Sequence, residues 1–272
     1  MIKSKTTSRS LINIIGIPLL LVLIYCGGFL FTTFIYIAIF LSTIELGNIC
    51  KIKGYSIQST WLYIIYVYMY ISHYIEFNTF DILQIIFIVF LLTSIFELFR
   101  KNKNSLENIA ITLLAFIWIG ISLDGIVYIR EINGGREFVY CIFLSVWMCD
   151  SAAFIFGSKF GRKKIARHIS PNKTWVGTIS GYLFSAVFIL CLVQNEFFKT
   201  NIYIFTFKDV LIMGFIVGII GQLGDFFESM IKREFKIKDS STLLQGHGGM
   251  LDRLDSLLFV IPSFYIYLYF IL

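Results

Sequence analysis

Long apolar runs dominate this sequence and restrict what it can fold into. A bilayer core about 30 Å thick is crossed by about 20 apolar residues of helix, and nine stretches of the 272-residue chain approach that length. They cover residues 11–26, 29–46, 60–77, 82–99, 108–123, 138–156, 175–194, 210–224 and 254–272, with Gly27 and Gly28 splitting the first two. Composition agrees, because 57% of the residues are hydrophobic, only 15% are charged and the mean hydropathy is +0.80. The sequence therefore predicts an all-α, polytopic integral membrane protein with about nine transmembrane helices.

The basic residues predict how these helices are oriented. With the N-terminal tail, residues 1–10, placed in the cytoplasm, 19 of the 23 Lys and Arg residues fall in cytoplasmic segments. The exceptions are Arg130, Arg136, Lys199 and Lys208. This bias is what the positive-inside rule requires. The net charge of +6 is therefore explained by the membrane loops, and no nucleic-acid partner is expected.

The remaining composition favours one domain over residues 1–272. No internal repeat and no long Gly/Ser or Pro linker divides the chain, and the first apolar run lacks a clear small-residue cleavage site, which favours an uncleaved span over a signal peptide. The five cysteines are odd in number, have no CxxC spacing and lie mostly in apolar runs. They are interpreted as reduced packing residues.

Charged residues concentrate in the segment 224–256. Its charged residues include the acids Asp225, Glu228, Asp239, Asp252 and Asp255 and the bases Lys232, Arg233, Lys236, Lys238 and Arg253. An acid at the edge of a span is costly unless it is paired, solvated or bound to a cation, although acids at the start of a helix also complement its dipole. Asp225 ends the eighth expected span, and Asp252 and Asp255 stand at the start of the ninth. Because Mg²⁺ takes one or two carboxylates plus substrate phosphate, these three acids could build one or two magnesium sites.

A glycine-rich run lies between these acids. Gly246, Gly248 and Gly249 can adopt positive φ and let backbone N–H groups approach a phosphate, but an ordinary flexible loop also explains the run. His247 alone is more often a loop hydrogen-bond donor than a catalyst. The basic residues from Lys232 to Lys238 alone are typical anchors at an anionic membrane surface.

A second group of polar residues precedes the seventh expected span. Asp150 lies near the cytoplasmic end of an otherwise apolar span, which makes it a functional candidate. Ser170, Lys173 and Thr174 place two hydroxyls and an ammonium at a helix start, a natural anion site, although Thr174 is also a suitable helix cap. The basic loop 157–164 is explained by topology alone.

The predicted topology brings this second group and the segment 224–256 to the cytoplasmic side of the membrane. Soluble phosphate compounds could reach that side, and so could a lipid headgroup from the inner leaflet. Glu45 and Glu97, at the cytoplasmic ends of the second and fourth spans, are expected to have a simple interfacial role.

The C-terminal half resembles the phosphatidate cytidylyltransferases, or CDP-diacylglycerol synthases. Their signature, S-x2-K-R-x4-K-D-x-S-x2-L-P-x-H-G-G-x2-D-R-x-D, is matched in register at Ser229, Lys232, Arg233, Lys238, Asp239, Ser241, Leu244, His247, Gly248, Gly249, Asp252, Arg253 and Asp255. The resemblance reaches back through Asp225 and the run 170–175 to Asp150, about 120 residues in all. Two positions depart from the pattern, since Gln245 replaces the usual Pro and Val176 a common Glu.

The resemblance implies transfer of CMP from CTP to phosphatidic acid, with release of pyrophosphate. It implies metal binding by Asp225, Asp252 and Asp255, with Mg²⁺ as the cofactor and space for a second cation. It assigns catalytic roles to Asp225, Asp252, Lys232, Arg233, Lys238 and Arg253, and substrate binding to Asp150, Ser170, Lys173, Thr174, Ser229, Asp239, His247, Gly248 and Gly249. It further implies a homodimer in the inner (plasma) membrane of a bacterium, with the active site facing the cytoplasm.

Three other functions compete with this interpretation. The CDP-alcohol phosphatidyltransferase motif, D-G-x2-A-R…G-x3-D-x3-D, is absent, because Asp124-Gly125 is followed by apolar residues and Asp252 and Asp255 are three apart. A transporter with a charged vestibule would explain the spans but not the signature. A relative that acts on another lipid phosphate, such as an isoprenoid ether lipid, stays open.

Overall fold

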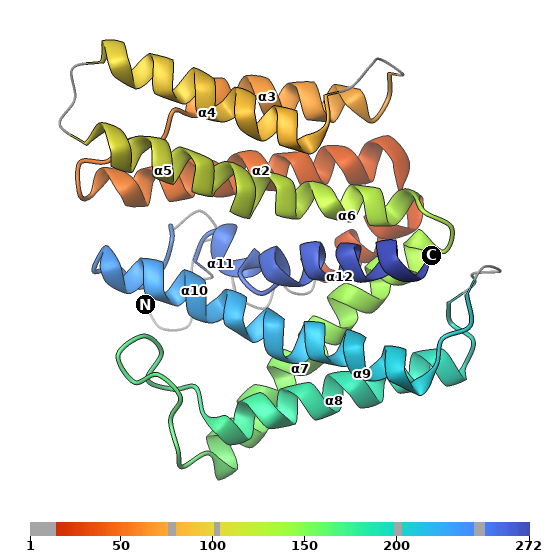
Figure 1. Cartoon of the computed structure of the whole chain (residues 1–272). Coiled ribbons are helices and arrows are strands. Elements are labelled where there is room, and N and C mark those ends of the chain that lie inside the picture. Colours follow the sequence, from red (N-terminus) through yellow and green to blue (C-terminus); the bar gives the residue numbers. More distant parts are fainter. Residues whose placement is uncertain (1–14, 76–79, 101–103, 199–202, 242–247) are drawn as a thin grey trace.

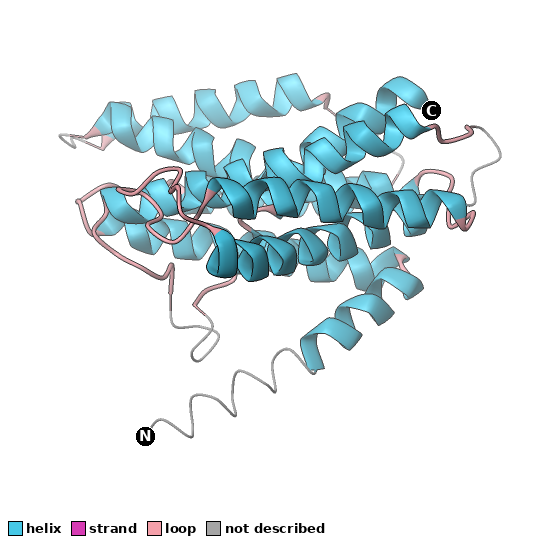
Figure 2. Ribbon diagram, turned by 90° about the horizontal axis from the view of Figure 1, so that it is seen from below, coloured by secondary structure: helices cyan, strands magenta, loops and turns pink. Residues whose placement is uncertain are grey.

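The computed structural model describes residues 15–75, 80–100, 104–198, 203–241 and 248–272. Within these ranges the regular structure is helical apart from one isolated bridge, between Lys164 and Thr174 (Figure 2). The helices are Ile15–Cys26, α2 (Gly28–Lys51), α3 (Ser59–Ser72), α4 (Ile82–Phe99), α5 (Ser105–Ala115), η1 (Phe116–Ile121), α6 (Ser122–Glu131), α7 (Gly135–Phe160), α8 (Trp175–Gln194), α9 (Phe207–Phe215), η2 (Ile216–Ile220), α10 (Gly221–Glu234), α11 (Leu251–Leu254) and α12 (Leu257–Ile271).

Six helices of the described chain are long and apolar enough to cross a membrane, which confirms the predicted polytopic membrane protein. They are α2, α4, α7, α8 and two continuous rods, Ser105–Glu131 and Phe207–Glu234, each interrupted by a π-helical segment. The other three expected spans coincide with the shorter helices Ile15–Cys26, α3 and α12. The structure thus supports six spans by length, and the count of about nine and the cytoplasmic N-terminus stay predictions.

The helices lie in stacked layers (Figure 1). Helices α3 and α4 form one outer layer, α2, α5 and α6 the next, and α10 to α12 a third, while α7 and α8 lie on the opposite side. Helix α7 packs along α8, and α6 packs against α12. The outer helices α4 and α8 have only 22% of their apolar stretch buried, as expected of surfaces that face lipid.

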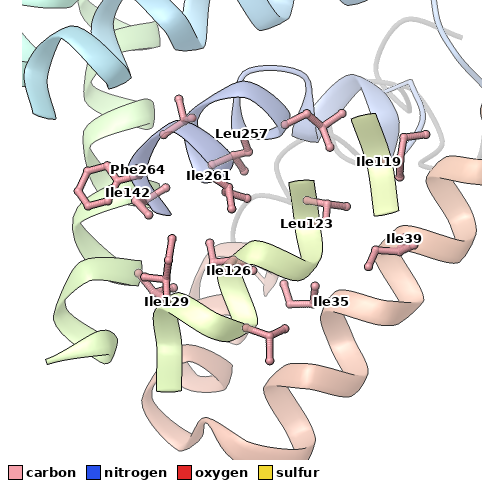
Figure 3. Packing of buried hydrophobic residues seen from close by; sticks show 14 of the residues in the cluster. Ile35, Ile39, Ile119, Leu123, Ile126, Ile129, Ile142, Leu257, Ile261 and Phe264 are labelled. Atoms are coloured by element: carbon pink, nitrogen blue, oxygen red, sulfur yellow. The ribbon is translucent and has the colours of Figure 1, made fainter. Parts of the chain in front are cut away.

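The core lies where α2, α6, α7 and α12 meet (Figure 3). Aliphatic and aromatic side chains from these helices point toward one another and are almost fully buried: Ile35, Ile39, Leu123, Ile126, Ile129, Ile142, Leu257, Ile261 and Phe264. Such interdigitated packing fixes the relative positions of the helices. The last helix is therefore held in the centre of the molecule.

The predicted break between the first two apolar runs is confirmed. The helix Ile15–Cys26 ends before Gly27, and Gly27 and Gly28 adopt φ values of 62° and 52°. This left-handed conformation favours glycine. Arg130 packs against the turn, because its Nε donates to the carbonyl of Ile24 over 3.0 Å and a Cβ on Gly27 would overlap its guanidinium.

Charged loops gather at one end of the helix bundle. Lys53, just after α2, forms an ion pair with Glu234 at the end of α10. Arg100, after α4, donates to the hydroxyl of Ser56. The guanidinium of Arg233 donates to the carbonyl of Ile169 in the α7–α8 loop over 3.2 Å. Loops from four parts of the chain therefore meet beside the segment that the sequence analysis singled out.

Candidate functional site

Helix α10 carries Asp225 and is fixed in place by Gln222. This buried glutamine, 5% exposed, donates from Nε2 to the carbonyls of Gly218 and Thr178 over 2.7 and 3.3 Å. Its Oε1 accepts from the hydroxyl of Thr178 over 2.7 Å. These bonds tie α10 to α8 about one turn before Asp225. Gly224 then allows a close approach, because a Cβ there would meet the carbonyl oxygen of Asp255.

Asp225 meets the loop that precedes α8, as the sequence analysis predicted. Its Oδ2 forms an ion pair with Nζ of Lys173, and its Oδ1 accepts from the hydroxyl of Ser229 over 3.4 Å. Lys173 also lies over the ring of Phe226, 4.6 Å from its centroid. A predicted metal-binding carboxylate and a predicted phosphate-binding ammonium are therefore partners.

Asp252 is held by more hydrogen bonds than Asp225. Its Oδ1 lies 2.7 Å from Nζ of Lys232, and its Oδ2 accepts from the backbone N–H groups of Ser240 and Gly249 over 2.9 and 2.7 Å. Burial acts to raise the pKa of Asp252, but these hydrogen bonds outweigh it, and the pKa lies below its usual range. Asp252 is therefore a carboxylate at neutral pH.

Asp255 connects the two ion pairs. Its carboxylate interacts electrostatically with Asp150 and Asp225 on one side and with Glu228 on the other. Oε2 of Glu228 lies 2.7 Å from Nζ of Lys232, whereas its buried Oε1 has no hydrogen-bond partner in the described part of the chain. Within the described residues these acids form ion pairs with Lys173 and Lys232. The acids outnumber these lysines, which favours a bound cation.

The donors present fit Mg²⁺ better than a metal that needs a full protein cage. Among the described residues, no three His, Cys, Asp or Glu side chains lie close enough together to hold a metal by themselves. Mg²⁺ is bound through one or two carboxylates and completes its shell with water and substrate phosphate. Asp225 and Asp252, with the unsatisfied Oε1 of Glu228 nearby, match that requirement.

The glycines of the signature loop pack against carboxylates. Gly248 has a φ of 79°, and a Cβ there would overlap Oδ2 of Asp252. A Cβ on Gly249 would overlap Oε2 of Glu45. The expected positive φ is thus confirmed at Gly248, and the expected approach to a phosphate stays a prediction. His247 and Gln245 lie outside the described residues.

Glu45 and Glu97 are corrections to the sequence analysis. Both were expected to be interfacial, but they are only 3% and 4% exposed. Glu97 accepts from the amides of Gln58 and Asn108 and from Arg100. Glu45 accepts from the signature loop itself. The sequence analysis did not predict the contacts of Gln222 and Glu45. The signal that could have indicated them is that each is a polar residue inside or beside an apolar span.

The α7–α8 loop is braced mainly by its own backbone. Oγ1 of Thr174 accepts from the N–H of Gly177 over 3.1 Å, which confirms the capping interpretation of this residue. Ser170 lies in a turn, where its N–H donates to the carbonyl of Ala166 over 2.9 Å. Arg233 holds this loop from α10. Lys238 and Asp239 are exposed just before Ser240, and Val176 is exposed on the first turn of α8.

Two cavities meet at Asp150. A cavity of about 460 Å³ has charged and polar side chains in an otherwise apolar wall, among them Asp150, Lys164, Lys173, Thr174, Gln222 and Asp225, and is called the polar cavity below. A mainly apolar cavity of about 480 Å³ is lined by residues of the helix Ile15–Cys26, α2, α6, α7 and α12, together with Asp150 and Arg253. The arrangement can hold a phosphate compound in the polar cavity and an apolar chain in the apolar cavity, with the carboxylate of Asp150 between them.

Comparisons with known proteins identify similar chains. The model of the cytidylyltransferase family matches residues 7–271. The phosphatidate cytidylyltransferase of Staphylococcus saprophyticus is 35% identical over 259 residues, which is 93% of this chain and 95% of the relative. The proteins of the same name from Staphylococcus haemolyticus and Staphylococcus aureus (strain COL) are 33% and 32% identical, with the same shares covered.

Proposed function

The chain belongs to the cytidylyltransferase family, and from this membership we infer that it is a nucleotidyltransferase of phospholipid biosynthesis. It transfers CMP from CTP to phosphatidic acid, giving CDP-diacylglycerol and pyrophosphate. The likeness to phosphatidate cytidylyltransferases extends over 93% of the chain, and the residues matched by the family model, 7–271, include the whole segment 224–256.

The chemistry needs charge control more than a protein nucleophile. The phosphate of phosphatidic acid is already anionic at neutral pH and attacks the α-phosphorus of CTP directly. The difficulty is to bring two anions together and to stabilise the pyrophosphate that leaves. In this proposal Lys173 and Lys232 contact phosphate oxygens, and Arg233, Lys238 and Arg253 add further cations, the arginines offering bidentate geometry.

The two cavities that share Asp150 carry this proposal. The polar cavity, with Lys173 and Asp225, takes the triphosphate of CTP. The apolar cavity takes acyl chain from phosphatidic acid, with Arg253 in its wall. In this arrangement the lipid phosphate meets the nucleotide near Asp150, between the cavities.

Mg²⁺ completes the site in this proposal. Asp225 and Asp252 hold it, with Asp255 as a third acid, and there is space for a second cation. When bound, it offsets negative charge on the phosphates. The protein orients these acids through Ser229, Ser240 and Gly249.

The membrane arrangement follows the charge distribution. About nine helices span the inner membrane, the N-terminus is cytoplasmic and the active site faces the cytoplasm, where CTP is found. The gathering of charged loops at one end of the bundle supports this orientation. A homodimer is part of the same proposal.

Purified protein in detergent should convert labelled CTP and phosphatidic acid into CDP-diacylglycerol when Mg²⁺ is present. Asp225→Asn and Asp252→Asn should each abolish product, whereas the exposed control Glu107→Gln should keep full activity. Product formation without CTP dependence would contradict the function. An isoprenoid ether lipid phosphate as acceptor tests the remaining alternative, because preference for it over phosphatidic acid would reassign the substrate.

A further inference from the structure

Glu45 on α2 binds a part of the chain that lies about 200 residues away. Its Oε1 accepts from the N–H of Met250 and the hydroxyl of Ser241 over 2.9 and 2.7 Å. Its Oε2 accepts from the N–H of Leu251 over 2.9 Å. Ser240 Oγ lies 3.0 Å from the same oxygen. One carboxylate thus gathers both described ends of the loop that joins α10 to α11.

The burial of Glu45 makes this contact energetically important. A buried carboxylate without hydrogen bonds is strongly unfavourable, and in the described chain Glu45 has no ion-pair partner. Among the described residues, its hydrogen-bond donors are backbone N–H groups and hydroxyls of the loop and of the start of α11. Hydrogen bonds to a charged acceptor are about twice as strong as neutral ones. The loop and the carboxylate therefore stabilise each other.

The contact reaches the catalytic acid through Ser240. The hydroxyl of Ser240 lies between Oε2 of Glu45 and Oδ2 of Asp252, 3.0 and 2.9 Å from them. The N–H of Ser240 and that of Gly249 also donate to Asp252. The backbone that orients Asp252 is thus the backbone that Glu45 holds.

The segment that follows α2 contacts the signature segment as well, at the end of α10. Lys53 pairs with Glu234 and lies over the ring of Phe235, 5.2 Å from its centroid. Tyr55 packs edge-on against the same ring. The cytoplasmic end of α2 thus contacts the end of α10 as well as the start of α11.

We propose that Glu45 is a positioning residue for the transferase reaction: through the loop residues Ser240, Ser241, Gly249, Met250 and Leu251, it fixes the orientation of Asp252. This inference rests on the proposed function. Among the described residues, the hydrogen-bond donors of Glu45 all belong to the loop and the start of α11. Its effect on catalysis therefore passes through the loop to Asp252. Residues of this kind typically change metal affinity or activity by about 10–100-fold when they are replaced.

The test compares Glu45→Gln with Glu97→Gln. Both replace a buried carboxylate at the same end of a membrane helix, but Glu97 contacts Gln58, Asn108 and Arg100 and forms no hydrogen bond with the described residues of the loop. In Glu45→Gln the new NH₂ group is itself a donor and faces a backbone N–H group, so at least one hydrogen bond to the loop is lost. Backbone hydrogen exchange across residues 240–252 should therefore become faster in Glu45→Gln, because the loop opens more easily, and stay unchanged in Glu97→Gln.

The kinetic measurement is the Mg²⁺ concentration for half-maximal activity. It should rise about 10–100-fold in Glu45→Gln and in Ser240→Ala, with little change in Glu97→Gln. Because Ser240 links the two carboxylates, the double variant should show less than the sum of the two single effects. Ser240→Ala is also the milder variant if Glu45→Gln does not fold.

Unchanged exchange and unchanged Mg²⁺ dependence in the Glu45 and Ser240 variants would overturn the inference. Equal effects from Glu97→Gln would do so as well, because they would indicate a general loss of stability. A wild-type protein that makes no CDP-diacylglycerol would instead contradict the proposed function, and the exchange measurement would still test whether Glu45 holds the loop.

Discussion

The ammonium of Lys232 lies 2.7 Å from Oδ1 of Asp252 and joins the end of α10 to the short helix α11. The two side chains are only 13% and 10% exposed. The same ammonium lies 2.7 Å from Glu228, so one lysine is shared by two acids. A buried cation in this position both holds the loop and keeps two carboxylates from repelling each other.

Replacement of Lys232 should affect stability and activity together. Lys232→Ala leaves Glu228 and Asp252 without their shared cation, and breaking a buried pair typically costs about 3–5 kcal/mol. We expect a lower midpoint of thermal unfolding in detergent and a loss of activity of about 100-fold or more. Lys159→Ala, an exposed lysine at the end of α7, is the matched control and should change neither. Retained activity in Lys232→Ala would exclude a role for this ammonium at the phosphates.

Replacement of Lys173 should act mainly on CTP. Lys173→Ala removes the ion-pair partner of Asp225 and one cation from the polar cavity. We expect kcat/KM for CTP to fall about 100-fold, the range seen when one charge-stabilising donor is lost, while the KM for phosphatidic acid changes little. Lys163→Ala, exposed in the same loop, controls for the general charge of this face of the protein. An equal loss in both variants would indicate an effect of charge alone.

The loss of stability on substitution at Gln222 or Thr178 should increase with the number of hydrogen bonds that the substitution removes. Thr178→Val deletes the hydroxyl bond to Oε1, whereas Gln222→Ala also deletes the bonds to the carbonyls of Gly218 and Thr178. At about 1 kcal/mol for each net hydrogen bond, Gln222→Ala should lower the midpoint of unfolding two to three times as much as Thr178→Val. Equal shifts would show that the carbonyl bonds contribute nothing measurable.

Removal of divalent cations should abolish the transferase reaction reversibly. A chelator should stop product formation from CTP and phosphatidic acid, and added Mg²⁺ should restore it, because the acids around Asp255 outnumber the lysines paired with them. Asp255→Asn should raise the Mg²⁺ concentration needed for half-maximal activity but still form product, whereas Asp225→Asn should form none. Full turnover in the presence of the chelator would contradict the proposed magnesium site.

The orientation in the membrane can be measured with single cysteines in a background that lacks the five native ones. A cysteine at Arg162, in the α7–α8 loop, should react with an impermeant reagent only from the cytoplasmic side. A cysteine at Gln194, at the other end of α8, should react only from the outside. The reverse pattern would overturn the predicted topology.

The helices and half of the site could be predicted from the sequence, because local patterns determine them. Each of the nine apolar runs overlaps helical structure, and the charge bias predicted that Lys173 and Asp225 lie on the same side of the membrane, with which their ion pair agrees. Gln222 and Glu45 could not be assigned, because their partners in other helices and loops lie 44 to 206 residues away and no local pattern encodes such contacts. A polar residue beside an apolar run indicates a need for partners without identifying them.

The contact between Glu45 and Leu251 also constrains how the chain is made. Ribosomes add roughly 5–20 residues per second, so the donors that satisfy Glu45 follow it by about 10–40 s across the intervening 206 residues. During that interval α2 carries a carboxylate whose native partners do not yet exist. The carboxylate therefore lacks these hydrogen-bond donors until residues 240–251 have been synthesised, so this anchor of α2 forms late in the synthesis of the chain.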